Sequence, residues 1–390
     1  MDSTLTEADS LFVQIMSQYG DPWRLSDPSS HDARGLEELR AIFRICISRQ
    51  KRAIGPQGYI YFDYLSNKGF NALAATANSY DFVTIFSGIL FNLYRLFFCF
   101  MSDPETIPTI GQISSETLSQ DILSSIRNND YTFTAYQHPV DDTRFRAAQN
   151  LALVSCILVL NHEIGHVVFC HPHLMQTQFN TSVYEEFCLT TASTKENQLR
   201  RAFEWEADSY AAVSTYACVH HIRDLLVGLR GLSMDYILSV SAFMLFLFIH
   251  KQIGAKFGSE SDSHPAPRDR WLWMIHAIEQ HDLCKKLRSG DFEIGSSIQD
   301  VATFWSRNKL FDPSDFDLSP SAADEMKGRY DLARIALREV DGELKDLESR
   351  RNEGGMLWRK EHKIEADDYA KAAIAHLANG VVGRVSPDNK

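Results

Sequence analysis

Residues 158–173, LVLNHEIGHVVFCHPH, place four histidines and a glutamate beside an apolar run. Within this stretch, His162, Glu163 and His166 form the pattern HExxH. Side chains four residues apart lie on the same face of a helix, so both imidazoles can point at one metal ion. Zinc suits this arrangement, because a catalytic zinc takes about three protein ligands and keeps one position for water. The pattern therefore predicts His162 and His166 as metal ligands and Glu163 as the group that reaches the water.

A third ligand would separate a metal site from a chance match, and residues 200–212, RRAFEWEADSYAA, offer one. Glu204 and Asp208 are four residues apart in a helical pattern and share a face. We expect Glu204 to supply the third ligand, and Asp208 to hydrogen-bond the far nitrogen of a ligating histidine. Glu206 faces another side and is expected to be a solvated charge. His171, past the predicted helix end, is expected to interact with the helix dipole rather than with metal.

The order of these motifs resembles the gluzincin metallopeptidases of the HtpX and CAAX-prenyl-protease type, in which HExxH is followed by ExxAD. Two weaker elements fit the same pattern: an upstream NAxA strand at residues 71–74, and a downstream HPxxxxR element formed by His264, Pro265 and Arg270. The resemblance covers about residues 71–270. It extends more loosely to the soluble Lit-type phage-exclusion peptidases, which fit better because this chain has no convincing membrane span. The motifs leave the choice of subfamily open.

The resemblance implies a zinc-dependent endopeptidase with one Zn²⁺ per chain and a protein or peptide as its substrate. The zinc would lower the pKa of its bound water to about 7 and polarise the scissile carbonyl. Glu163 would take the proton of the water and pass it to the leaving amine. The resemblance places His264 near the cleft, where it would either donate to the oxyanion or cap the loop before Pro265; the two roles weigh equally.

The resemblance also implies a strand that lines the substrate cleft. Asn71, Ala72 and Ala74 would form an edge to which an extended peptide adds through backbone hydrogen bonds. Small alanine side chains would let the peptide approach closely. Because backbone pairing depends little on the side chains of the substrate, the sequence does not predict the cleavage site.

Two helices and a small sheet are needed to position these groups. Apolar spacing predicts a helix over about residues 143–170, ended by Pro172, and a second helix over about 198–222. Residues 59–65 are aromatic and β-rich, and residues 67–86 predict a hairpin. The fold class expected is therefore α+β and predominantly helical, with a zincin-like core whose hairpin sheet lies above the metal helix. We expect an N-terminal helical segment at 1–58, the metallopeptidase core at 59–310, and a charged helical extension at 320–390.

Composition limits the partners and the compartment. A net charge of −12 argues against a nucleic-acid partner, which would need a basic face. The seven cysteines are scattered without a CxxC pair, and the N-terminus is acidic and polar, so we expect a cytoplasmic protein. Three apolar segments, 82–101, 147–160 and 236–249, are predicted to be buried core helices, because a membrane span needs about 20 mostly apolar residues. Peripheral membrane contact and the oligomeric state stay open.

Two alternative functions compete with the endopeptidase hypothesis. In the first, the chain is a catalytically degenerate, zinc-binding regulatory protein whose charged C-terminal helices bind a partner. Glu163 speaks against it, because a structural zinc site needs no general base and usually closes its fourth ligand position. The second is a membrane-embedded protease, which rests on the apolar segments 82–101 and 236–249.

Overall fold

The computed structural model describes most of the chain between residues 3 and 310 and parts of the segment that follows. The described residues are 3–23, 39–43, 47, 60–78, 80–113, 118–128, 130, 137–180, 183–185, 194–253, 265–288, 295–310, 324–325, 327–331, 334–338, 340, 342 and 349. His264 and most of the predicted 320–390 extension lie outside them. The described residues of that extension are helical, and the predicted boundaries at 58, 310 and 320 stay predictions.

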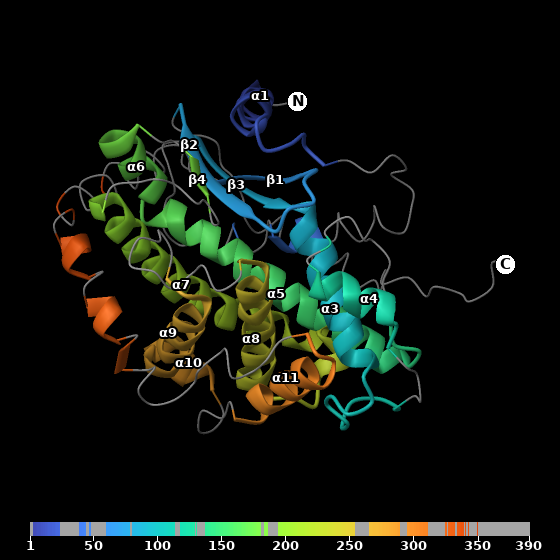
Figure 1. The fold of residues 1–390 in the computed structure, drawn as a ribbon. Helices are drawn as coiled ribbons and strands as arrows, with labels where there is room; N and C mark the ends of the chain where they lie inside the picture. The colour runs from blue at the N-terminus through green and yellow to red at the C-terminus, as the bar shows by residue number, and fades with distance from the viewer. Residues whose placement is uncertain are drawn as a thin grey trace.

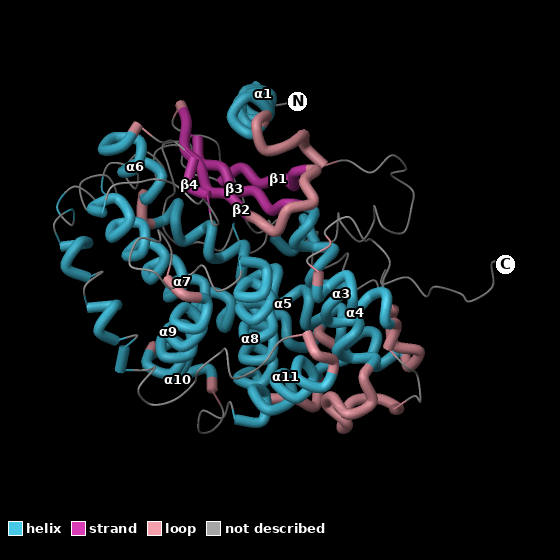
Figure 2. The backbone as a smooth tube through the Cα atoms, in the orientation of Figure 1, coloured by secondary structure: helices cyan, strands magenta, loops and turns pink. Residues whose placement is uncertain are grey.

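A small sheet covers one end of a helical body (Figures 1 and 2). Its strands are β1 (Ile60–Leu65), β2 (Ala72–Ala77), β3 (Tyr80–Phe86) and β4 (Val183–Glu185). The helices are α1 (Ser3–Met16), α3 (Ser87–Ser102), α4 (Gln120–Arg127), α5 (Asp142–Val168), α6 (His171–Phe179), α7 (Thr194–Ile222), α8 (Met234–Ile253), α9 (Pro267–Gln280), α10 (Asp282–Leu287) and α11 (Gly295–Arg307), with two 3₁₀ turns at Arg223–Leu225 and Val227–Leu229. The predominantly helical α+β prediction is confirmed.

Alternation along the strands puts both faces of the sheet into a core. Side chains two residues apart point to the same face of a strand. Leu73 and Ala75 of β2 pack with Phe12 of α1 on the outer face. Ala72 and Ala74 belong to the main core, which contains α3, α5 and α8, on the inner face. The hairpin sheet therefore lies above the predicted metal helix, α5, as expected.

The order of strands in the sheet is β1-β3-β2-β4. The predicted hairpin is present, because β2 and β3 pair antiparallel from Ala72 opposite Ile85 to Ala77 opposite Tyr80. However, β2 is not an edge strand. β4 pairs antiparallel with it, from Leu73 opposite Glu185 to Ala75 opposite Val183. The prediction of an open edge at residues 71–74 is therefore wrong at residues 73 and 74, where β4 pairs with β2.

Helix α5 is the central element of the body. It and the segment Met234–Lys251 of α8 are, by length and composition, long and apolar enough to cross a membrane, but 100% and 89% of their most apolar windows are buried inside the fold. This burial is what we expected of core helices. The cysteines that the structure describes are all buried and free of disulfides, namely Cys99, Cys156, Cys170, Cys218 and Cys284.

Arg144 fixes the start of α5. The side chain of Asp141 caps the helix by accepting a hydrogen bond from the Arg144 backbone N–H. The buried guanidinium donates to five backbone carbonyls, those of Met101, Asp103, Thr106, Ile107 and Ile110. A buried arginine is stable only when its donors are satisfied, so the loop after α3 is wrapped around this side chain. The N-terminus of α5 is thereby tied to α3.

Helices α5 and α7 approach closely within the HExxH motif. A Cβ atom on Gly165 would lie 3.0 Å from the Cα atom and 3.3 Å from the carbonyl oxygen of Ala207. Glycine therefore lets the two helix backbones meet at this point. Because His166 follows Gly165, and Asp208 follows Ala207, this contact controls how far the chemical groups of the two helices stand apart.

Replacing Gly165 by alanine should lower the free energy of unfolding by about 1–3 kcal/mol, because the added methyl group overpacks the α7 backbone. The measurement is urea unfolding of the purified chain. Gly328→Ala is the matched control, since Gly328 is also helical but has no atom within 4 Å of its added Cβ. That control should be neutral or stabilising by up to about 1 kcal/mol. Equal stability of the two variants would contradict the tight contact.

Candidate metal centre

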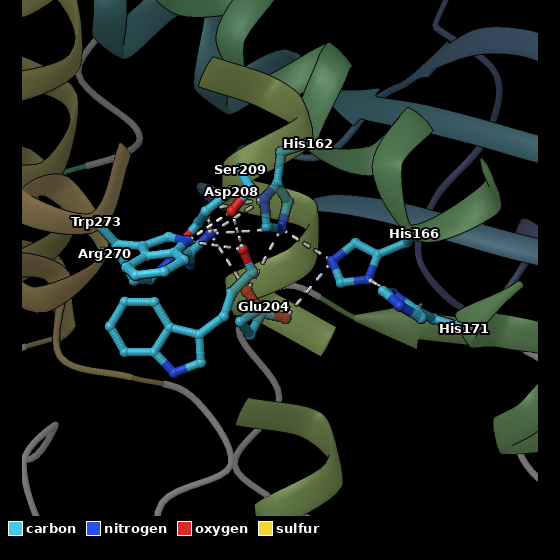
Figure 3. A network of polar contacts seen from close by, with 9 residues as sticks. His162, His166, His171, Glu204, Asp208, Ser209, Arg270 and Trp273 are labelled. Carbon is cyan, nitrogen blue, oxygen red and sulfur yellow. Dashed lines mark hydrogen bonds and ion pairs between the residues drawn. The ribbon is translucent and has the colours of Figure 1, made fainter. Parts of the chain in front are cut away.

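The polar groups predicted to bind metal converge between α5 and α7 (Figure 3). The Nε2 atoms of His162 and His166 lie 2.9 Å apart. Oε2 of Glu204 lies 3.4 Å from Nε2 of His162, and Oε1 lies 3.5 Å from Nε2 of His166. The three residues can therefore offer one ligand atom each to a common point, and all three are buried.

These donors fit a zinc ion in type and in spacing. Zinc binds histidine nitrogen and carboxylate oxygen at about 2.0–2.2 Å in tetrahedral geometry, which sets ligand atoms roughly 3.3–3.5 Å apart. The distances from Glu204 fall in or near that range, with Oε2 measured to His162 and Oε1 to His166. The two imidazole nitrogens would separate by about 0.4 Å to reach it. Two histidines and one glutamate are also a donor set of catalytic zinc sites, which keep a fourth position for water.

Asp208 and Arg270 form a buried pair that orients the His162 ring. Oδ1 of Asp208 lies 3.0 Å from Nδ1 of His162, the far nitrogen of that ring, where the sequence predicted it. Arg270 of α9 grips Asp208 with two hydrogen bonds, Nε to Oδ2 at 2.9 Å and Nη2 to Oδ1 at 2.8 Å. Nη2 of Arg270 also lies 3.2 Å from Oε2 of Glu204. One buried cation therefore offsets two buried carboxylates and links α9 to α7.

His166 is backed by a second histidine that the sequence analysis placed elsewhere. Nδ1 of His171 lies 2.9 Å from Nδ1 of His166, and Nε2 of His171 lies 3.1 Å from Oε2 of Glu206. The expectation of His171 at a helix dipole is wrong, because this ring is fully buried at the start of α6. The expectation of Glu206 as only a solvated charge is also wrong: its side chain is 33% exposed, but its carboxylate binds His171.

The chain reversal after α5 explains why spacing alone missed His171. Helix α5 ends at Val168, and Cys170 takes the left-handed conformation, with φ 62°. Pro172 then lies in the first turn of α6, where a proline is well tolerated, rather than only ending α5. This tight turn folds His171 back against His166. Because non-glycine residues seldom adopt a positive φ, the cysteine at position 170 does not predict this left-handed turn.

The environment of His171 keeps its ring neutral and oriented. Burial lowers the pKa of His171 below its usual value, although the Glu206 carboxylate acts in the opposite direction. The ring stacks on Phe203, with centroids 4.0 Å apart and planes at 12°. A neutral imidazole has one donor and one acceptor nitrogen. The His171 ring can therefore accept a hydrogen bond from one partner and donate one to the other, but it cannot donate to both.

The other predicted site residues are placed less directly. Glu163 is fully buried on α5 beside the ligands. Asn71 immediately precedes β2, and Ala72 and Ala74 lie on its inner face; β4 pairs with the strand at residues 73–75. An apolar cavity of about 20 Å³ borders His162 and Arg270, with lining that includes Phe70, Leu245 and Met274. Contact of Asn71, Ala72 and Ala74 with substrate stays a prediction.

Comparison with known proteins adds a peptidase likeness to this geometry. Residues 120–285 match the family described as Peptidase U49, which supports similarity to a peptidase family over that segment. The segment contains every residue of the converging site, from His162 to Arg270. No curated protein matches the chain. No solved structure matches it either.

The purified chain should bind about one zinc ion, and Glu204→Ala should weaken that binding by about 100-fold or more, because a ligand matters more than an outer contact worth about 10–100-fold. The measurement is metal content by mass spectrometry together with competition against a chelator. The control is Glu279→Ala, which removes an exposed glutamate from α9. A well-folded wild type without zinc, or a Glu204→Ala variant that binds as tightly as wild type, would contradict the three-ligand site.

Proposed function

We propose that this protein is a zinc-dependent endopeptidase that hydrolyses peptide bonds of a protein substrate. The observation that carries the proposal is the convergence of His162, His166 and Glu204 on one point. Glu163, which follows His162 in the sequence, is fully buried on the same helix. The likeness of residues 120–285 to a peptidase family supports it. The cysteines that the structure describes are buried, as is usual for thiols in a reducing compartment, and we place the activity in the cytoplasm on that ground.

The residues of the site divide the work of hydrolysis. Bound to the three ligands, zinc would lower the pKa of a water and polarise the scissile carbonyl. Glu163 takes a proton from the attacking water and returns it to the leaving amine, as general base and then general acid. Asp208 holds His162 in the tautomer that leaves Nε2 as a ligand, and Arg270 holds Asp208 in place through two hydrogen bonds.

Two substrate contacts are proposed on the sequence resemblance alone. His264 is our candidate for the second donor to the oxyanion, beside the metal. Asn71, Ala72 and Ala74 are our candidates for pairing with an extended peptide. In this structure β4 pairs with residues 73–75, so a peptide that pairs with β2 there would displace Val183–Glu185.

The burial of the site supports a second candidate function. His162 is 3% exposed, while Glu163, His166 and Glu204 are fully buried. A structural zinc site needs no route for a substrate, so this burial favours a catalytically degenerate, zinc-binding regulatory protein. We give the endopeptidase precedence because a carboxylate next to the first ligand is costly to bury and has no purpose in a structural site.

Glu163→Gln separates the two functions. The variant should lose cleavage by about 100- to 10,000-fold, because general acid–base catalysis contributes on that order, while its zinc content stays equal to that of wild type. The assay incubates zinc-loaded protein with a peptide library and counts new termini by mass spectrometry. Glu279→Gln, at an exposed position on α9, is the matched control. Cleavage that persists in Glu163→Gln would contradict the mechanism, and no cleavage by the zinc-loaded wild type would favour the regulatory protein.

A further inference from the structure

The buried His171 ring joins two groups that differ in kind. On one side it faces Nδ1 of His166, a predicted metal ligand, and on the other side it faces the carboxylate of Glu206. Figure 3 shows His171 on the side of His166 that points away from Glu204. The three side chains therefore form a line that runs from the ligand position towards the surface, where Glu206 is partly exposed.

We propose that His171 and Glu206 are positioning residues that fix the tautomer and the ring orientation of His166 for metal binding. This inference rests on the metal site of the proposed function. It assigns to His166 the support that Asp208 and Arg270 give to His162. Each imidazole ligand then has its own backing group on the nitrogen that does not bind the ion.

Hydrogen positions follow from the geometry in one consistent way. If Nε2 of His166 binds the ion, the proton of the neutral ring lies on Nδ1. That proton is donated to Nδ1 of His171, which accepts it and must carry its own proton on Nε2. This second proton is donated to the Glu206 carboxylate, which accepts hydrogen bonds only. The reverse order would require Glu206 to donate and His166 to lose its metal-binding lone pair.

Packing holds His171 in the orientation that this line needs. Its ring is stacked on Phe203 of α7 and lies at 28° to Phe169, with that centroid 5.8 Å away. The left-handed Cys170 between α5 and α6 brings the ring back towards His166. The ordinary role of a buried histidine is to fill the core, but core packing alone would not align both ring nitrogens with polar partners.

The test compares zinc affinity of the full-length chain, by competition with a chromophoric chelator, in wild type, His171→Phe and His171→Gln. Phenylalanine keeps the stacking on Phe203 but removes both nitrogens, so zinc binding should weaken about 10- to 100-fold, the usual effect of an outer partner. Glutamine can accept from His166 and donate to Glu206 through its amide, so it should restore most of the affinity. His173→Phe, two residues further along α6, is the matched control and should bind like wild type.

Substitution of Glu206 gives a second test, which leaves the buried His171 ring unchanged. Glu206→Ala should weaken zinc binding about 10-fold, and Glu206→Gln less, because an amide oxygen still accepts from His171. The double variant of His171→Phe with Glu206→Ala should be no weaker than His171→Phe alone, since Glu206 acts through His171. Replacing zinc with Co²⁺ adds a readout: the visible ligand-field absorption should shift in His171→Phe and not in His173→Phe.

The outcomes separate this inference from the proposed function. Zinc affinity and Co²⁺ absorption unchanged in folded His171→Phe and in Glu206→Ala would overturn the positioning role while leaving the metal site intact. A His171→Phe chain that fails to fold leaves the decision to Glu206→Ala and its glutamine counterpart. A wild-type chain that binds no zinc would overturn both the metal site and this role.

Discussion

The close approach of α5 and α7 at Gly165 and Ala207 is the constraint on which the rest of the site depends. Neither helix can form the site alone, because α5 carries the two histidines and α7 carries Glu204, Asp208 and Glu206. With the two backbones in contact at Gly165, Glu204 reaches to within 3.5 Å of both histidine rings. A larger residue at position 165 would press on the α7 backbone at Ala207, directly before Asp208. The surrounding body, with the sheet and α3 and α8 packed on α5, holds the helix pair in that register.

Electrostatics then explains the layout around the helix pair. Burial of carboxylates is unfavourable unless cations or hydrogen-bond donors compensate it. Arg270 supplies one positive charge to Glu204 and Asp208. A divalent cation bound by the two histidines and Glu204 would supply further positive charge. The two histidine rings have different partners: His162 contacts a buried carboxylate–arginine pair, whereas His166 contacts the buried His171 ring, which in turn contacts the partly exposed Glu206 carboxylate. The site is thus closed on the Arg270 side and reaches towards solvent on the Glu206 side.

Sequence reasoning succeeded where the information is local and failed where it depends on chain reversals. The spacing of His162, His166, Glu204 and Asp208 identified a shared face on each helix, and two short extended runs around a small-residue turn in residues 67–86 predicted the β2–β3 hairpin. Nothing local indicated that Val183–Glu185 would pair with β2, because that three-residue strand is short and far away in the sequence. His171 was missed for a related reason: its contact with His166 requires the left-handed turn at Cys170, and no residue type announces that turn.

The depth of the ligands also bears on how a metal ion would come and go. His166 and Glu204 have no exposed surface and His162 has almost none, so an ion cannot reach them by diffusion across the folded surface alone. Entry and exit would be limited by the rate at which α7 or α9 opens locally, and such openings of packed helices are rare events. A site of this kind equilibrates slowly with the metals around it. Its occupancy would be set while the chain is still folding, and the identity of the bound ion would record which metal was available at that time.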